Sequence, residues 1–317
     1  MSVRSPIQAK RHVSADAWLA ALAISAMALF GAAPSEAQEL GHKMLGTLGL
    51  HAGSQPSSGL YIADRFLAYS ADELIDRNGR RIPVGVDLHA VANGIGIGGS
   101  FELPWFSTYM NASIGVPAAH VTLHTDRPEV SVDKFGLGDL YVQPIKLGWK
   151  LSQLDIVTGY AFYAPTGRFE PGGRDGVGSG QWTHEFSLGG TVYFDSAKTW
   201  QLSALASYNL NQRKQDIDIR RGDTIQIQGG ASKTLFGIVD VGLAGYALWQ
   251  VSDDRGTALP QPLRGARDRA YGLGPEINII LASLRSRITV RYEHDISVNA
   301  RPLGQILVIG LTILAFP

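Results

Sequence analysis

Hydrophobic positions in the C-terminal two-thirds of the chain recur with a period of two residues. The clearest segment is 287–296, in which Ile288, Val290, Tyr292 and Ile296 alternate with charged or polar residues. Because successive side chains of a strand point to opposite faces, this pattern predicts a strand with one apolar and one polar face. Strands of transmembrane β-barrels have this character, with apolar groups toward lipid and polar groups toward the interior.

Short and long connections alternate between these segments. The short turns are 151–153, 196–198, 235–237 and 282–284. Longer polar segments separate them, and outer-membrane barrels place short turns in the periplasm and long loops outside. The pattern therefore predicts an all-β chain, a transmembrane antiparallel barrel of about 12 strands with both termini in the periplasm.

The pattern also gives approximate spans. We expect strands at 59–69, 82–101, 106–122, 138–150, 154–165, 182–194, 200–212, 223–234, 239–252, 268–281, 286–297 and 304–316, and outer loops at 70–81, 123–137, 166–181, 213–222, 253–267 and 298–303. In the fourth strand, Pro144 and a change of apolar parity predict a β-bulge. The last strand is apolar on both faces, which contact with a plug or with the N-terminal segment would explain.

The N-terminus predicts export. Lys10 and Arg11 precede an apolar stretch at 18–30, and the small residues of 35–37 form a cleavage site. An apolar core of this length is typical of a secretory signal peptide and is short for a membrane-spanning helix, the alternative. We therefore expect a cleavable signal peptide at 1–37.

The rest of the chain shows no linker or composition shift. Residues 38–58 are small and polar, which predicts a flexible periplasmic N-terminal segment, and 59–317 would form the barrel. Trp182 and Phe194 share a strand face and would lie about 30 Å apart, close to the separation of two aromatic girdles. The alternative is a soluble β-sandwich, in which these aromatics belong to an ordinary core.

Composition excludes several classes of function. The chain has no cysteine, so disulfides and thiolate chemistry are excluded. Without residues 1–37 its net charge is −1, which does not favour nucleic acid as a partner. No later stretch is long and apolar enough for a transmembrane helix.

The candidate site residues lie on predicted lumen faces. They are Glu185, Glu276, Arg291 and Glu293. Such groups either tune a pore and bind solute or form a polar network that fills a narrow barrel.

We expect no catalytic residues, metal ligands or cofactor. His184 and Ser187, three residues apart in a strand, point to opposite faces, so they cannot form the nucleophile–base pair that a hydrolase needs.

Several segments resemble the outer-membrane family named for the meta-pathway of phenol degradation. They include Gly59-Leu-Tyr-Ile, Gly-Asp-Leu-Tyr-Val-Gln-Pro within 135–149, Tyr-Ala-Pro-Thr-Gly ending at Gly167, Trp182-Thr-His-Glu-Phe-Ser and Tyr271-Gly-Leu-Gly-Pro-Glu. The resemblance implies a barrel in the bacterial outer membrane and passage of aromatic or other apolar nutrients. Outer-membrane lipid, the barrel assembly machinery and a small-molecule solute are the expected partners. The assembly machinery commonly reads a terminal aromatic residue, whereas here Phe316 is followed by Pro317.

These features predict an outer-membrane channel for passive uptake of small solutes. The alternative is a non-transporting barrel with a structural or surface-binding role. The width of the lumen distinguishes the two, because an open path favours transport and a packed charged core favours the alternative.

Overall fold

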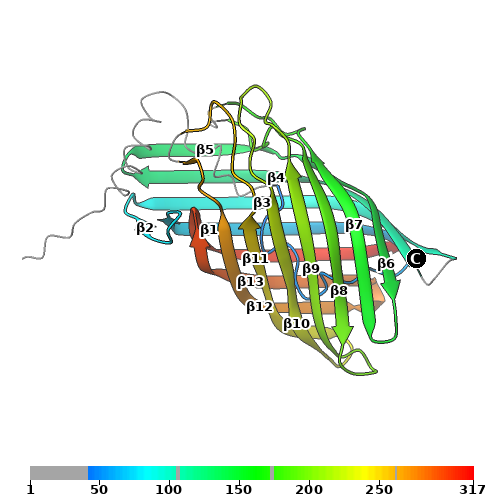
Figure 1. Cartoon of the computed structure of the whole chain (residues 1–317). Coiled ribbons are helices and arrows are strands. Elements are labelled where there is room, and N and C mark those ends of the chain that lie inside the picture. The colour runs from blue at the N-terminus through cyan, green and yellow to red at the C-terminus, as the bar shows by residue number, and fades with distance from the viewer. Residues whose placement is uncertain (1–41, 105–107, 172–174, 261–262) are drawn as a thin grey trace, which may run out of the picture.

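The computed structural model describes residues 42–104, 108–171, 175–260 and 263–317, and these form a closed antiparallel β-barrel of twelve strands (Figure 1). The elements are β1 (Gly59–Ile75), β2 (Arg81–Ile82), β3 (Val86–Leu103), β4 (Thr108–Asp126), β5 (Glu129–Leu137), β6 (Leu140–Lys150), β7 (Leu154–Ala164), β8 (Thr183–Tyr193), β9 (Trp200–Asn211), β10 (Thr224–Leu235), β11 (Val239–Gln250), β12 (Arg269–Leu281), the 3-10 turn η2 (Ala282–Leu284), β13 (Ser286–Asn299) and β14 (Arg301–Phe316). β2 and β5 are additions at one end, so the prediction of about 12 barrel strands is confirmed.

The barrel closes where its first and last strands meet. β14 pairs with β1 from Leu60 opposite Phe316 to Ile75 opposite Arg301. Every other barrel strand pairs with its neighbours along the chain, with β4 pairing both β3 and β6. Closure satisfies the backbone hydrogen bonds without a free edge, which the hydrocarbon interior of a membrane requires.

The two faces of the wall differ as the alternation predicted. In β13, Val290 and Tyr292 are exposed on the outside, whereas Arg291 and Glu293 are buried inside. Exposed apolar side chains also cover the outside of β3, β8, β9 and β12. Trp182 and Phe194, expected in the two aromatic girdles, are both exposed at opposite ends of β8. The outer surface is therefore suited to outer-membrane lipid.

The connections distinguish two ends of the barrel. The short-turn end carries the four turns between β6–β7, β8–β9, β10–β11 and β12–β13, together with the C-terminus. The long-loop end carries the connections 165–182, 212–223 and 251–268. Within the described residues, no helix has the length and apolar character needed to cross a bilayer.

One expected loop is a hairpin. The segment 123–137 is the end of β4 followed by β5, which pairs with β4 from Ala118 to Asp126 and projects past the neighbouring strands (Figure 1). Its outward positions include His124 and Asp133 instead of an apolar series, so the lipid-facing pattern stops although backbone pairing continues. Backbone pairing needs no apolar face outside the membrane, which is why the hydrophobic pattern missed this hairpin.

Two finer predictions are confirmed. The β6–β7 register shifts between Val142 and Ile145, which places the expected bulge at Pro144. The lumen side of β14 is apolar because Ile306 and Val308 pack in a cluster that Met44 of the N-terminal segment joins. The strand is therefore buried on its inner face and lipid-facing on its outer face.

Candidate functional site

Residues 42–58, called the inner segment below, run through the barrel lumen. At the long-loop end, Nδ1 of His42 forms a 2.7 Å hydrogen bond with Oγ1 of Thr183 at the start of β8. Near the short-turn end, the Ser54 hydroxyl donates to Thr191 at 2.7 Å, close to the end of β8. The Ser100 hydroxyl then donates to the Pro56 carbonyl, just before the chain enters β1.

This arrangement corrects the expectation of a flexible periplasmic segment at 38–58. Over its described part, 42–58, backbone groups of the inner segment bond directly to barrel side chains. The Leu48 amide donates to Gln228 at 3.0 Å, and the Gly53 amide donates to Ser203 at 2.8 Å. Leu50 is fully buried. A run of small polar residues has the composition of a disordered tail, but here these residues form hydrogen bonds with polar groups of the barrel wall.

The candidate carboxylates face the lumen and contact the inner segment. The Lys43 ammonium donates to Glu185 at 2.6 Å, with both side chains buried. Glu276 accepts from Arg291 at 2.7 Å and from the Leu50 amide at 3.1 Å. Arg291 also donates to the Gly46 carbonyl. These three residues therefore hold the inner segment against the wall.

Glu293, the fourth candidate, lies apart from this network. It is fully buried, and among the described residues neither carboxylate oxygen has a hydrogen-bond partner. Gly46 packs so close that an added Cβ would lie 2.5 Å from Oε2 of Glu293. The inner segment thus covers this carboxylate and separates it from solvent.

Asp139, between β5 and β6, connects the inner segment to the loop 165–182 at the long-loop end of the barrel. Its carboxylate accepts hydrogen bonds from His42 at 2.7 Å and from the amides of Ser179 at 2.8 Å and Gly167 at 2.9 Å. Burial opposes the charged carboxylate, but the hydrogen bonds and charge of His42 and the bonds from Ser179 outweigh it and lower the pKa of Asp139. A charged Asp139 therefore fixes three separate segments in one place.

Ser179, His42 and Asp139 do not form the relay of a serine hydrolase. Both Ser179 and Asp139 approach Nε2 of His42, while Nδ1 contacts Thr183. In a hydrolase triad the acid and the nucleophile occupy opposite ring nitrogens. The expectation for His184 is also met, because its ring contacts the Tyr160 hydroxyl and Gln212, away from the lumen-facing Ser187.

Four residues of the site were not predictable from the sequence pattern: His42, Lys43, His51 and Asp139. His51 contacts Asp240 at 2.8 Å, and Lys43 and Glu185 are separated by 142 positions. No local periodicity connects partners so far apart, and only barrel closure brings them together. Among the described residues, no group of three or more histidine and acidic side chains is placed to hold a metal ion.

The inner segment leaves one side of the lumen uncovered. On β1 the inward side chain of Arg65 is exposed, although the next inward residues, Leu67 and Tyr69, are buried. Its cross-strand partners are Gly94 on β3 and Gly310 on β14. A Cβ at Gly94 would meet nothing within 4 Å, and one at Gly310 would have contacts of 3.6 Å or longer. There is therefore free space beside Arg65 within the lumen.

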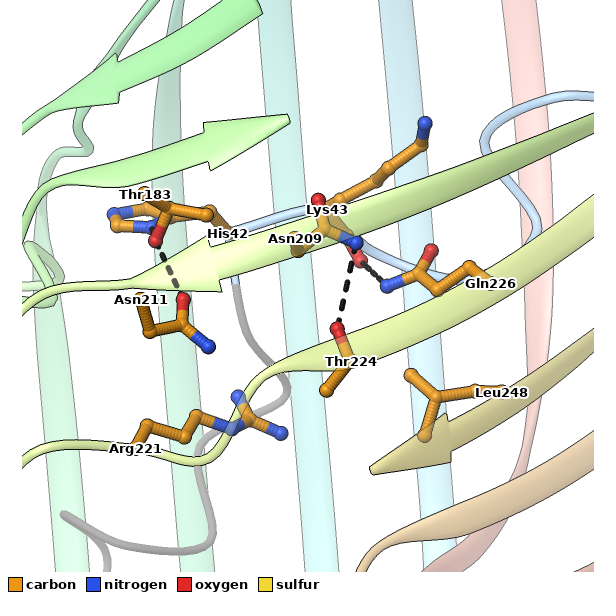
Figure 2. A pocket seen from close by; sticks show the side chains of 9 residues that line it. All are labelled: His42, Lys43, Thr183, Asn209, Asn211, Arg221, Thr224, Gln226 and Leu248. Carbon is orange, nitrogen blue, oxygen red and sulfur yellow. Dashed lines mark hydrogen bonds between the residues drawn. The ribbon is translucent and has the colours of Figure 1, made fainter. Parts of the chain in front are cut away.

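Two cavities beside the inner segment are small. A cavity of about 10 Å³ lies between the inner segment and β8–β11, where Figure 2 shows the Lys43 side chain directed away from Arg221. Thr183 donates to Asn211 in its wall, and Gln226 donates to the Lys43 carbonyl (Figure 2). A second cavity, of about 20 Å³, lies beside Met44 and Tyr69. Volumes this small hold a water molecule or two and no larger solute.

Comparison with known proteins agrees with this architecture. The structure is similar to an outer membrane channel from Pseudomonas putida F1, with a TM-score of 0.71, 12% identity, and coverage of 82% of this chain and 97% of that one. It is more distantly similar to the NanC porin, with a TM-score of 0.45, 10% identity, and coverage of 80% and 98%. No curated protein sequence matches. The protein is thus an integral outer-membrane barrel. The family model described as "Putative MetA-pathway of phenol degradation" matches residues 81–309, and the chain belongs to this family.

Proposed function

We propose that the protein is a passive outer-membrane channel for small solutes. The observation that carries the proposal is the uncovered side of the lumen, where Arg65 is exposed and Gly94 borders free space. A barrel stabilised only by a packed interior would fill this side as completely as it fills the region around Leu50. The inner segment then narrows the channel to one side of the barrel.

The chemistry of the lumen supports passage without catalysis. Polar side chains cover the inner faces of β8 to β10, and the grouping of Ser179, His42 and Asp139 lacks the hydrolase geometry. We therefore assign the protein no enzymatic role. Insertion by the barrel assembly machinery and a small-molecule solute belong to the same proposal. The family description suggests that aromatic solutes are among those carried.

One observation favours a non-transporting structural or surface-binding barrel. The inner segment is held by buried ion pairs, and the two cavities beside it are very small. If this packing persists along the whole barrel axis in the membrane, no solute passes. The two functions therefore differ in a single measurable property, the conductance of the folded protein.

The test is reconstitution of the full chain. Folded protein, identified by heat-modifiable migration and a β-type circular dichroism spectrum, is incorporated into planar bilayers and solute-loaded liposomes. A channel gives discrete conductance steps and flux that decreases with solute size. A folded barrel without conductance or flux for ions and for solutes of any size would establish the structural or surface-binding alternative.

A further inference from the structure

Three cationic side chains remain accessible in the lumen, and one of them lies beside the free space. Arg65 is exposed, and it has no ion pair or hydrogen bond among the described residues. Arg287, near the short-turn end of β13, is half-buried and likewise has no ion pair there. Lys146 of β6 is half-buried, and its ammonium donates a long hydrogen bond of 3.4 Å to the Ser54 carbonyl. These three side chains come from three separate strands of the wall.

The lumen-facing carboxylates of the covered side are buried, whereas Glu102 of β3, near the short-turn end, is exposed. From β7 to β13 the buried ones are Asp155, Glu185, Asp240, Glu276, Glu293 and Asp295, and each is 5% exposed or less. Four examples show how they are satisfied: Glu185 binds Lys43, Glu276 binds Arg291, Asp240 binds His51 and Asp295 accepts from the Tyr246 hydroxyl. A solute beside Arg65 therefore meets a cation, because Glu276, the carboxylate within electrostatic reach of Arg65, is already bound by Arg291.

Two tyrosines add hydrogen-bond donors near Arg65. Tyr141 and Tyr163 lie within electrostatic reach of its guanidinium, and their rings are 5.1 Å apart. Both are half-buried, and within the described residues neither hydroxyl has a hydrogen-bond partner. Arg65, Tyr141 and Tyr163 thus carry donors within electrostatic reach of one another that have no acceptor among the described residues, an arrangement that an anion completes.

We infer that the uncovered side of the lumen selects small organic anions, and that Arg65 is the residue that binds their carboxylate group. This inference rests on the proposed channel function and specifies its substrate class. A planar guanidinium binds a carboxylate through two parallel hydrogen bonds, which favours carboxylates over single-atom anions. The glycines opposite Arg65 leave room for the body of the solute. Accessible cations also raise the local concentration of anions and repel cations.

The experiment measures ion selectivity of the full chain in planar bilayers. Reversal potentials are recorded across a potassium chloride gradient and then with potassium acetate replacing chloride on one side. We expect wild-type protein to prefer anions over potassium, and acetate to compete with chloride current at low concentration. Wild-type channels that conduct but prefer potassium, or that ignore acetate, would overturn the inference and leave the proposed channel intact. Absence of all conductance would instead refute the channel itself.

Variants then assign the effect to Arg65. Arg65→Gln should reduce anion preference and weaken acetate competition roughly tenfold or more, the loss expected when a charge-assisted bidentate pair is removed. Arg65→Lys should keep the anion preference but lose part of the acetate competition. Gly94→Leu, which fills the adjoining space while Arg65 remains, should lower acetate passage more than chloride passage. Arg264→Gln, on an exposed long loop, is the matched control and should leave selectivity unchanged. Equal behaviour of Arg65→Gln and Arg264→Gln in folded channels would exclude the assigned role.

Discussion

At the residue scale, neighbouring positions of one strand experience different solvents. Val290 is exposed on the outside of β13 between Ile277 and Ile309, whereas the adjacent Thr289 donates a hydrogen bond to Asn278 inside the lumen. The same kind of substitution therefore has a different cost at each position.

Val290→Arg should reduce the stability of the barrel in lipid by about 2–4 kcal/mol, because an arginine near the bilayer midplane loses its hydration. Thr289→Arg should cost less, since its side chain enters the lumen beside Gly310, where there is space. Folded yield and urea unfolding in lipid vesicles measure the difference. Equal destabilisation by the two variants would show that the faces of β13 are assigned wrongly.

A buried carboxylate in a long loop should make stability depend on pH. Burial in the 251–268 loop raises the pKa of Asp254 to about 6, although the Gly222 amide and Gln250 donate to it. The folded state therefore binds the proton of the Asp254 carboxyl more tightly than the unfolded chain does. The stability that this proton contributes is present below about pH 4 and is lost as pH rises through 6, a loss of at most about 3 kcal/mol. Asp254→Asn, whose oxygen accepts the same bonds, should therefore gain stability relative to wild type at pH 7.5 but not at pH 4.

The adjacent Asp253 is the matched control, because its hydrogen bond and ion pair with Arg267 lower its pKa. Asp253→Asn should give no gain at pH 7.5 and a small loss at most, since the pair is exposed. Urea unfolding of the three proteins at both pH values provides the comparison. A gain for Asp253→Asn equal to that for Asp254→Asn would mean that general loop charge, and not burial, is responsible.

At the element scale, the inner segment behaves as an additional wall element bound through its side chains and backbone. Its ends are fixed separately, by His42 with Asp139 at one end and by Ser54 with Thr191 at the other. Between them, Lys43 and Arg291 provide the charged contacts. The segment should therefore loosen locally when one contact is removed, while the barrel strands remain paired.

Lys43→Gln should loosen the part of the inner segment nearest the long-loop end, because it leaves Glu185 buried without its cation. Removing one partner of a buried ion pair typically costs about 3–5 kcal/mol of stability. The double variant Lys43→Gln/Glu185→Gln should recover much of this loss, since both charges are then absent. Hydrogen exchange of residues 43–50 in detergent reports the change. If the double variant exchanges as fast as or faster than Lys43→Gln, the ion pair does not hold the segment.

At the scale of the whole molecule, the lumen has two unlike halves. Most polar contacts of the inner segment are with β8 to β13, whereas Gly94 of β3 and Gly310 of β14 border free space near Arg65. In the closed strand order, β9 lies across the barrel from β1, so the uncovered wall is opposite the covered one (Figure 1). The orientation of the barrel in the membrane decides which end of this free space faces the outside of the cell.

Orientation can be tested directly because the chain has no cysteine. Single cysteines at Arg264, on a long loop, and at Ser283, in a short turn, are both exposed sites. A membrane-impermeant maleimide applied to intact cells should label the first and not the second, because long loops of such barrels face outward. Both should react after the outer membrane is permeabilised. Labelling of Ser283→Cys in intact cells would reverse the proposed orientation.

The sequence by itself determined the barrel wall. Period-two alternation in segments such as 287–296 was enough to predict the strands and their faces, because lipid and lumen impose opposite solvents on adjacent residues. Pro144 was enough to locate a bulge, because proline cannot donate to the ladder. These signals are local, and each is repeated along the chain.

Only the tertiary structure decided how the lumen is occupied. The positions of Glu185 and Glu276 on an inner face were predictable, but their partners Lys43 and Leu50 lie in a segment without regular structure. A local sequence pattern does not show which backbone amides or cations of this segment contact the barrel wall, because these contacts form only when β1 and β14 close the ring. The same closure leaves Arg65 uncovered while burying the carboxylates, because one short segment can cover only one side of the lumen.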